Sequence, residues 1–115
     1  MIDRLIKEYG VGYIKMDYNI EPGIGTDLHA DSAGDGMLSH ERAYLKWLEA
    51  VFKRYPDLVI ENCSSGGLRM DYAMLSRYSI QSTSDQDDYR YYCTIAANSP
   101  SALTPEQSAI GHITS

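Results

Sequence analysis

Acidic side chains follow strand-like segments at two places in the chain, where they could act in catalysis. In the first, residues 12–18 have the sequence GYIKMDY, and Lys15, Asp17 and Asn19 stand at alternate positions. Successive side chains of a strand point to opposite faces, so these three share one face. A lysine beside a carboxylate keeps it ionised, which is the state that a nucleophile needs. The alternative is a structural ion pair at the end of a strand, and the residues alone leave both open.

The second place is Asp85, which follows a further strand-like segment. By the same alternation Gln81, Thr83 and Asp85 share a face, which brings a second aspartate to the same edge of the sheet as Asp17. Two carboxylates above one sheet suit glycoside hydrolysis, in which one attacks or stabilises the anomeric carbon and the other delivers a proton. The alternative is that the acidic residues 85–88 open a helix, whose dipole favours negative charge at its start.

Two further groups of residues could bind a ligand. The glycines of residues 62–67 (NCSSGG) would let a ligand approach the backbone closely. This segment lacks the lysine and the spacing of a phosphate-binding P-loop, so a sugar suits it as well as a phosphate. Asp27, His29 and Asp31 have metal-ligating side chains, but a single loop without a second group is weak evidence, and we expect no metal site.

Helix-like and strand-like segments alternate along the whole chain. Apolar residues at helical spacing, followed by Gly10 in one case and Pro56 in another, predict helices, and short apolar runs predict strands. We expect helices over residues 2–9, 40–55, 71–77 and 88–98, strands over 12–18, 58–63, 79–83 and 101–103, and a long loop over 19–39. Residues 104–107 (TPEQ) resemble a capping box and predict one more helical turn.

Strands that alternate with helices predict an α/β fold, in which the strands are parallel and joined by right-handed crossovers. In such folds ligands bind at the carboxyl ends of the strands, which is where the polar residues gather. The 115 residues allow one domain, over residues 1–115, with only a few strand–helix units. Since a closed eight-stranded barrel needs at least about 200 residues, the chain is either a small open sheet or a portion of a barrel.

The composition excludes several classes of protein. Sixteen Asp and Glu against ten Lys and Arg give a net charge of −6, whereas nucleic acid and anionic membranes favour basic partners. No apolar run approaches the roughly 20 residues of a membrane span, and no signal region precedes the first helix, so we expect a cytoplasmic protein. Cys63 and Cys93 make no disulfide framework, and we expect Cys93 to be a small core residue.

Three segments together resemble the family 36 α-galactosidases, which are melibiase or raffinose-type glycoside hydrolases. They are residues 13–19 (YIKMDYN), 62–71 (NCSSGGLRMD) and 82–85 (STSD), in the family's order and at compatible spacing. The resemblance extends over essentially the whole chain. It implies a TIM barrel, (β/α)8, of which residues 1–115 would form about strands 4–7 of the catalytic domain.

The resemblance also implies a role for individual residues. The family's nucleophile falls on Asp17 and its acid/base on Asp85, while Asp88 matches a supporting acid. The residues implied to bind the sugar are Lys15, Asn19, Cys63, Ser65 and Gly66. The implied reaction is the retaining hydrolysis of a terminal α-1,6-linked galactose from a small galactoside, and it needs no metal or organic cofactor.

Other parts of the family's sugar site are absent from the chain, namely an upstream acidic pair, an aromatic platform, an arginine and an N-terminal β-sandwich. We therefore expect little activity from the chain alone. An open portion of a barrel has two unpaired strand edges, so we expect it to associate with itself or with the rest of the barrel. Two alternatives remain, a non-catalytic carbohydrate-binding or assembly module and a galactosyltransferase similar to the raffinose synthases.

Overall fold

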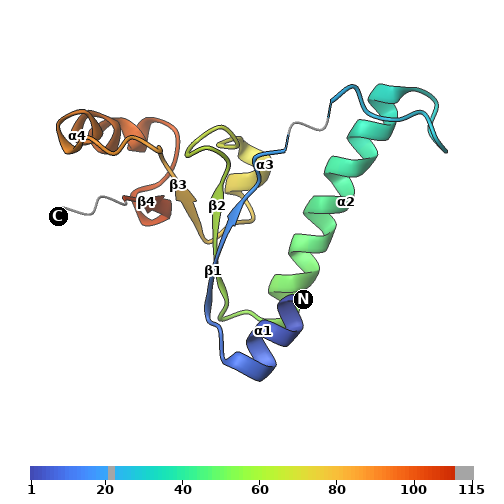
Figure 1. Ribbon diagram of the computed structural model, residues 1–115, viewed down its shortest axis with the longest axis horizontal. Coiled ribbons are helices and arrows are strands. Elements are labelled where there is room, and N and C mark those ends of the chain that lie inside the picture. Colours follow the sequence, from blue (N-terminus) through green and yellow to red (C-terminus); the bar gives the residue numbers. More distant parts are fainter. Residues whose placement is uncertain (21–22, 111–115) are drawn as a thin grey trace. The chain divides into compact units, whose positions relative to one another are not determined.

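The computed structural model describes residues 1–20 and 23–110, and the chain divides into two compact units. The first unit holds Met1–Tyr18 and the chain from Asp57 onward, and the second holds Asn19–Pro56. Figure 1 labels the helices and strands of both.

The first unit is built on a sheet of parallel strands that lie side by side in chain order (Figure 1). They are β1 (Tyr13–Asp17), β2 (Val59–Cys63), β3 (Ile80–Ser82) and β4 (Ser108–Ala109). Parallel neighbours need a crossover between them, and the helices α3 (Tyr72–Leu75) and α4 (Tyr89–Asn98) lie in two of the crossovers. The predicted α/β class with parallel strands is confirmed, and β1, β2 and β3 lie within the segments predicted for them.

The prediction of a fourth strand at residues 101–103 is wrong. Ser99–Ser101 forms the 3-10 turn η1, and the next two amides donate to the Ser99 carbonyl at 3.0 and 3.1 Å. Because those amides are bonded within the turn, they cannot join a strand ladder. Strand β4 comes later, directly after the helical turn η2 (Pro105–Gln107), and that turn is where the sequence predicts it.

The helices of the first unit begin and end at residues suited to those positions. Helix α1 (Ile2–Tyr9) ends at Gly10, whose φ of 66° lies in the left-handed region that glycine tolerates. Helix α3 begins after Asp71 and α4 after Asp88, and each carboxylate accepts hydrogen bonds from the first backbone amides of its helix. The helix start predicted for residues 85–88 is therefore made by Asp88, and Asp85 lies ahead of the helix.

The register of the strands assigns their side chains to two faces. Lys15 stands opposite Glu61 on one face, whereas Met16 stands opposite Asn62 on the other. Asn62 is also opposite Gln81, and its amide donates to the Gln81 side-chain oxygen at 2.6 Å. Both amide side chains are at most 1% exposed. This hydrogen bond therefore satisfies polar groups that would be costly to bury alone.

The second unit consists of a loop and the long helix α2 (Ala33–Arg54). The sequence predicts a loop up to residue 39, and this is wrong from residue 33 onward. Helix α2 begins after Ser32, whose hydroxyl accepts a hydrogen bond from the Asp35 amide at 3.1 Å. A serine cap of this kind stabilises the start of a helix by about 1 kcal/mol, which offsets part of the cost of the glycines in its first turns.

The glycines near the start of α2 allow the preceding loop to contact the helix closely. A Cβ atom at Gly36 would lie 1.9 Å from the carbonyl oxygen of Thr26, and one at Gly25 would lie 2.3 Å from that of Ala33. Gly34 makes no such contact, since the nearest atom to its Cβ would be the Ser32 hydroxyl oxygen at 3.8 Å. Two of the glycines that predict a loop at this point in the sequence thus serve close packing between the loop and the helix.

Other expectations concern residues on the surface of the two units. Cys93 is exposed, not a core residue as predicted. Within residues 1–20 and 23–110, no three His, Cys, Asp or Glu side chains gather to hold a metal ion, so Asp27, His29 and Asp31 form no such group. None of the helices described is both long and apolar enough to span a membrane.

We predict opposite effects for two glycine substitutions in the first turns of α2. Gly36→Ala forces a methyl group against the Thr26 carbonyl and should lower the free energy of unfolding by about 1–3 kcal/mol. Gly34→Ala makes only an ordinary van der Waals contact with Ser32 and should raise it by about 0.5 kcal/mol, because alanine favours the helix. Urea unfolding followed by circular dichroism measures both. Equal effects of the two substitutions would contradict this packing.

Candidate active site

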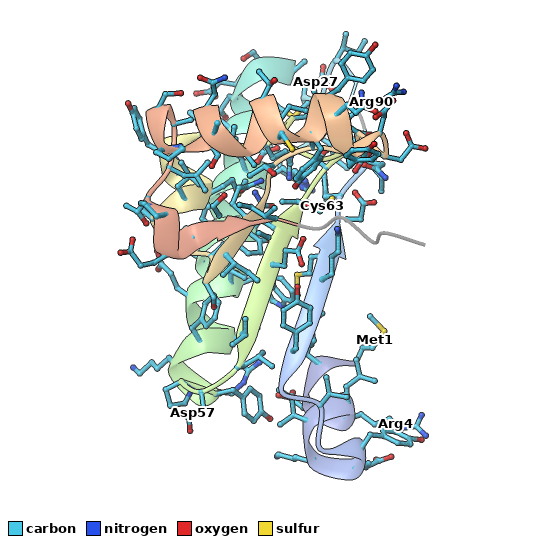
Figure 2. All side chains as sticks on the ribbon, turned by 90° about the vertical axis from the view of Figure 1, so that its left-hand side faces the viewer. Met1, Arg4, Asp27, Asp57, Cys63 and Arg90 are labelled. Atoms are coloured by element: carbon cyan, nitrogen blue, oxygen red, sulfur yellow. The ribbon has the colours of Figure 1, made fainter. Side chains whose placement is uncertain are left out.

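The candidate nucleophile, Asp17, is the last residue of β1 and its side chain is exposed. It stands in register with Cys63, the last residue of β2, which is a fully buried free thiol. Figure 2 shows Cys63 at the carboxyl end of β2, and Asp57 at the other end of the sheet. Asp17 therefore lies at the edge where parallel sheets bind ligands, as the sequence predicts.

The chain that leaves β1 is fastened to the chain that leaves β2. The Tyr18 amide donates to the Cys63 carbonyl at 2.8 Å, and the Ser64 hydroxyl donates to the Tyr18 carbonyl at 2.7 Å. The Arg69 guanidinium also lies over the Tyr18 ring, 3.9 Å from its centre. These three contacts fix the backbone on the carboxyl side of Asp17.

The loop after β2 packs against the segment that carries Asp85. Gly66 has a φ of 73°, and a Cβ atom there would lie 2.6 Å from both the Asp85 amide nitrogen and the Ser84 Cα. A Cβ at Gly67 would lie 2.9 Å from the Thr83 carbonyl oxygen. The glycines were predicted to admit a ligand, but what they admit in this structure is the neighbouring backbone.

The side chain of Asp85 is exposed, and the residues around it are held by hydrogen bonds. The Thr83 hydroxyl is 2.8 Å from that of Tyr92 in α4. On the other side, the Ser84 hydroxyl accepts from the Gln86 amide at 3.0 Å. The Gln86 side-chain oxygen accepts in turn from the Asp88 amide at 2.9 Å. Asp85 thus projects from a segment that is anchored at both ends.

The prediction that Asp85 shares a strand face with Gln81 and Thr83 needs correction. Strand β3 ends at Ser82, and Gln81 lies opposite Asn62, on the face of the sheet away from Lys15 and Asp17. Strand alternation from Gln81 therefore does not carry Asp85 to the face of Asp17. The position of Asp85 depends instead on the turn that follows β3 and on its contact with Gly66.

The partner predicted for Lys15 is also corrected. Its ammonium lies 3.1 Å from the Glu61 carboxylate and donates to the Ser82 hydroxyl at 3.2 Å. The Tyr13 hydroxyl donates to the other oxygen of Glu61. Among the charges that act on Lys15, Asp17 is the weakest. Lys15 thus pairs mainly with Glu61, and keeping Asp17 ionised is not its principal interaction.

Glu61 is a residue that the motifs did not indicate. It is 6% exposed in the middle of β2. One signal in the sequence could have identified it, because a charged side chain inside the apolar segment LVIENC needs a partner that pairs with its charge or donates hydrogen bonds to it. The alternation that places Lys15 and Tyr13 on one face supplies two such partners on the neighbouring strand.

The pKa values of this group follow from burial and from the hydrogen bonds to Glu61. Burial alone raises the pKa of Glu61, but hydrogen bonds from Tyr13, Lys15 and Ser82 outweigh it and lower the pKa. Burial lowers the pKa of Lys15, but the hydrogen bond and charge of Glu61 outweigh it and raise the pKa. Burial and Glu61 together raise the pKa of Tyr13 to about 12. The ion pair is therefore charged at neutral pH, and the phenol keeps its proton.

Of the residues predicted to form the site, the structure brings several to one edge of the sheet. Asp17 and Cys63 are in register, and the Gly66 backbone contacts that of Asp85. Ser65, which precedes Gly66, is exposed and has a φ of 40°, so it lies in the left-handed region that non-glycine residues rarely adopt. Asn19 is the first residue of the second unit, and its role in the site stays a prediction.

Comparison with known proteins identifies the family to which the chain belongs. The model of the melibiase family matches residues 1–115. The chain belongs to the melibiase family. It is similar to an α-galactosidase of Escherichia coli, with 31% identity over 110 residues, which cover 94% of the chain and 15% of the relative. It is also similar to α-galactosidase 2 of Pediococcus pentosaceus, with 32% identity over 117 residues, 98% of the chain and 16% of the relative.

A third relative, α-galactosidase Mel36A of Lactobacillus acidophilus, is 33% identical over 70 residues, which cover 59% of the chain and 10% of the relative. The chain therefore spans at most 16% of the length of these curated relatives. No solved structure matches the chain.

We predict that Gly66→Ala disturbs the site while Gly12→Ala does not. The methyl group at position 66 would collide with the backbone of Ser84 and Asp85, and alanine disfavours the positive φ. The free energy of unfolding should fall by roughly 1–3 kcal/mol, and the amide signals of Ser84 and Asp85 should shift in NMR spectra. Gly12 precedes β1, and a Cβ atom there would have no neighbour within 4 Å, so it is the matched control. Unchanged signals at Asp85 in Gly66→Ala would contradict the contact.

Proposed function

We propose that this chain supplies the two catalytic carboxylates of a retaining α-galactosidase, with Asp17 as nucleophile and Asp85 as acid/base. One observation carries the proposal. Asp17 emerges at the carboxyl end of β1, and the segment bearing Asp85 packs against the loop that follows the adjoining strand β2. Both carboxylates are exposed, as groups that contact a substrate must be. Family membership supports the same chemistry.

The reaction would proceed in two displacements at the anomeric carbon. The Asp17 carboxylate attacks C1 of a terminal α-galactoside while Asp85 gives its proton to the departing glycosidic oxygen, which leaves a galactosyl ester on Asp17. Asp85 then takes a proton from water, and the resulting hydroxide attacks C1. This releases galactose and restores the Asp17 carboxylate. Retention requires the two carboxyl groups to come within about 5–5.5 Å.

The remaining predicted residues would contact the sugar. The half-exposed Lys15 ammonium would donate hydrogen bonds to sugar hydroxyls, beside the Asp17 carboxylate. Asn19, Ser65 and the Gly66 backbone would offer further polar groups, and Cys63 would form part of the floor of the site. The substrate class would be small galactosides with a terminal α-1,6-linked galactose.

We further propose that the sheet is part of a TIM barrel and corresponds to about strands 4–7. Four parallel strands in chain order, with helices in the crossovers, suit consecutive strands of such a barrel. The relatives named as α-galactosidases are much longer than the chain. The remainder of the barrel would supply the other sugar contacts, so the chain alone should hydrolyse aryl α-galactosides very slowly or not at all.

The nucleophile can be tested by trapping. The chain is incubated for hours with a fluorinated galactosyl inactivator, because slow trapping accumulates even where turnover is negligible. Mass spectrometry should find one galactosyl adduct on the peptide that carries Asp17, and Asp17→Asn should lose it. Asp57→Asn is the matched control, since Asp57 is exposed at the other end of the sheet, and it should keep the adduct (Figure 2).

Three results would contradict the proposal or favour one of its alternatives. An adduct that persists in Asp17→Asn would assign the nucleophile elsewhere. No adduct, together with galactose affinity that is unchanged in Asp17→Asn, would favour the non-catalytic carbohydrate-binding module. An adduct that resolves faster with a sugar acceptor than with water would support the galactosyltransferase.

We also predict that the isolated chain associates with itself. Among residues 1–20 and 23–110, β1 is an edge strand paired with β2, so its other edge offers backbone groups to a further strand. Light scattering across a range of protein concentrations should show a mass that rises above 12.9 kDa. A constant monomer mass at the highest concentration would rule out this association.

A further inference from the structure

Glu61 has no role in the reaction proposed above, yet it is the charged residue to which Lys15 is bound. Its side chain is 8% exposed, whereas that of Lys15 is 47% exposed. One partner of the ion pair is thus buried and the other can reach a ligand. In a surface ion pair both side chains are mobile. Here the buried carboxylate is held in place, so it can fix the position of the exposed ammonium.

The buried carboxylate is held from both neighbouring strands. Tyr13 and Lys15 of β1 contact its two oxygens, one each. Ser82 of β3 also donates a hydrogen bond to it, and the same hydroxyl accepts one from the Lys15 ammonium at 3.2 Å. Glu61, Lys15 and Ser82 therefore form a closed triangle of hydrogen bonds across three strands, and Glu61 has little freedom to change rotamer.

The triangle lies directly beneath the predicted reaction site. Lys15 and Glu61 are in register, and Asp17 and Cys63 are the next pair on the same face. Paired residues two apart along a strand are separated by roughly 6.5–7 Å. The titratable groups that act on Lys15 are Glu61, Cys63 and Asp17, so each comes from this face of β1 or β2. Because the Lys15 side chain is 47% exposed, its ammonium has a further N–H group available to a ligand that binds beside Asp17.

We propose that Glu61 is a positioning residue, whose buried carboxylate fixes the Lys15 ammonium beneath Asp17 so that it donates to a hydroxyl of the bound sugar. The inference rests on the proposed function, because it needs a substrate hydroxyl that accepts a hydrogen bond from Lys15. Glu61 itself does not touch the sugar. Its effect on binding passes through Lys15, and it should disappear when Lys15 is removed.

The test compares Glu61→Gln with Glu8→Gln in the whole chain. Glutamine keeps the shape of the side chain and removes its charge, and Glu8 makes an exposed ion pair with Arg4 in α1. The readout is the ε-CH₂ NMR signal of Lys15, which Lys15→Met assigns among Lys7, Lys15, Lys46 and Lys53. Glu61→Gln should lower the pKa of Lys15 and leave the other lysines unchanged, while Glu8→Gln should leave that of Lys15 unchanged. A Lys15 signal that titrates as in the unaltered chain would overturn the proposal.

The sugar contact is tested with free galactose as the probe. Galactose should shift the Lys15 signal in the unaltered chain, and this shift should be lost in Glu61→Gln while that in Glu8→Gln persists. An equal shift in all three would overturn the positioning role. The trapping experiment on Asp17 does not depend on this signal. If the adduct forms on Asp17 but the titration of Lys15 is the same in Glu61→Gln as in the unaltered chain, the positioning role of Glu61 is rejected alone. If the titration of Lys15 changes in Glu61→Gln but no adduct forms on Asp17, the catalytic role of Asp17 is rejected instead.

A second measurement covers the case in which Glu61→Gln does not fold. In the unaltered chain the ammonium protons of Lys15 should exchange with water more slowly than those of Lys7, because hydrogen bonds to Glu61 and Ser82 hold them. Nitrogen-15 spectra of the lysine side chains measure this exchange directly. Equal exchange at Lys15 and Lys7 would mean that the ammonium is not held, and would overturn the proposal without any substitution.

Discussion

The polar face of the sheet depends on the buried carboxylate of Glu61. A charge inside a protein is costly unless it is paired and hydrogen-bonded, and Glu61 finds its partners only on the strands to either side. Lys15 supplies the opposite charge, and Ser82 binds both members of the pair. Since a slip of one residue would turn these partners to the other face, the pairing also constrains the register of the strands. That register sets Asp17 beside Cys63.

A second constraint acts at the rim, and it involves backbone rather than side chains. Gly66 contacts the backbone of Ser84 and Asp85, and the chain after Asp17 is bonded to the chain after Cys63. Loops held by their backbones leave their side chains available. The side chains of Asp17 and Asp85 are accordingly exposed, because backbone contacts hold the segments that carry them. This is the arrangement that a preorganised site requires.

Local signals predicted much of this fold. The glycine that ends α1 and the aspartate that begins α4 act within one helical turn, so the sequence alone indicates them. The wrong predictions for Lys15 and Gly36 involve contacts between distant segments. Closeness in sequence suggests Asp17 as the partner of Lys15, but Glu61 on the neighbouring strand interacts with it more strongly, with its carboxylate 3.1 Å from the ammonium. Gly36 was taken as a loop residue because its need for close packing arises from Thr26, which lies outside the helix.

The same distinction applies to the candidate site. The positions of Asp17 and Cys63 follow from strand ends, which apolar runs reveal. The position of Asp85 depends on a turn beyond β3 and on Gly66, and no periodicity describes such a turn. The resemblance to the family predicts a role for Asp85 without describing that turn, because a motif records the outcome of packing that local patterns cannot represent. Glu61 escaped both approaches, although the cost of burying its charge was a physical reason to look for a partner.

The two edge strands of the sheet, β1 and β4, differ in how well they resist pairing with a further strand. This difference is relevant to the proposed barrel. β4 has two residues, and such short edge strands resist pairing with other chains. β1 has five residues and one lysine, and a lysine on an edge strand commonly prevents pairing by standing in the way. Lys15 cannot do so, because Glu61 draws its ammonium over the sheet toward β2 and β3. Lys15 is therefore held away from the edge of β1, which suits a strand that another strand of the proposed barrel would cover.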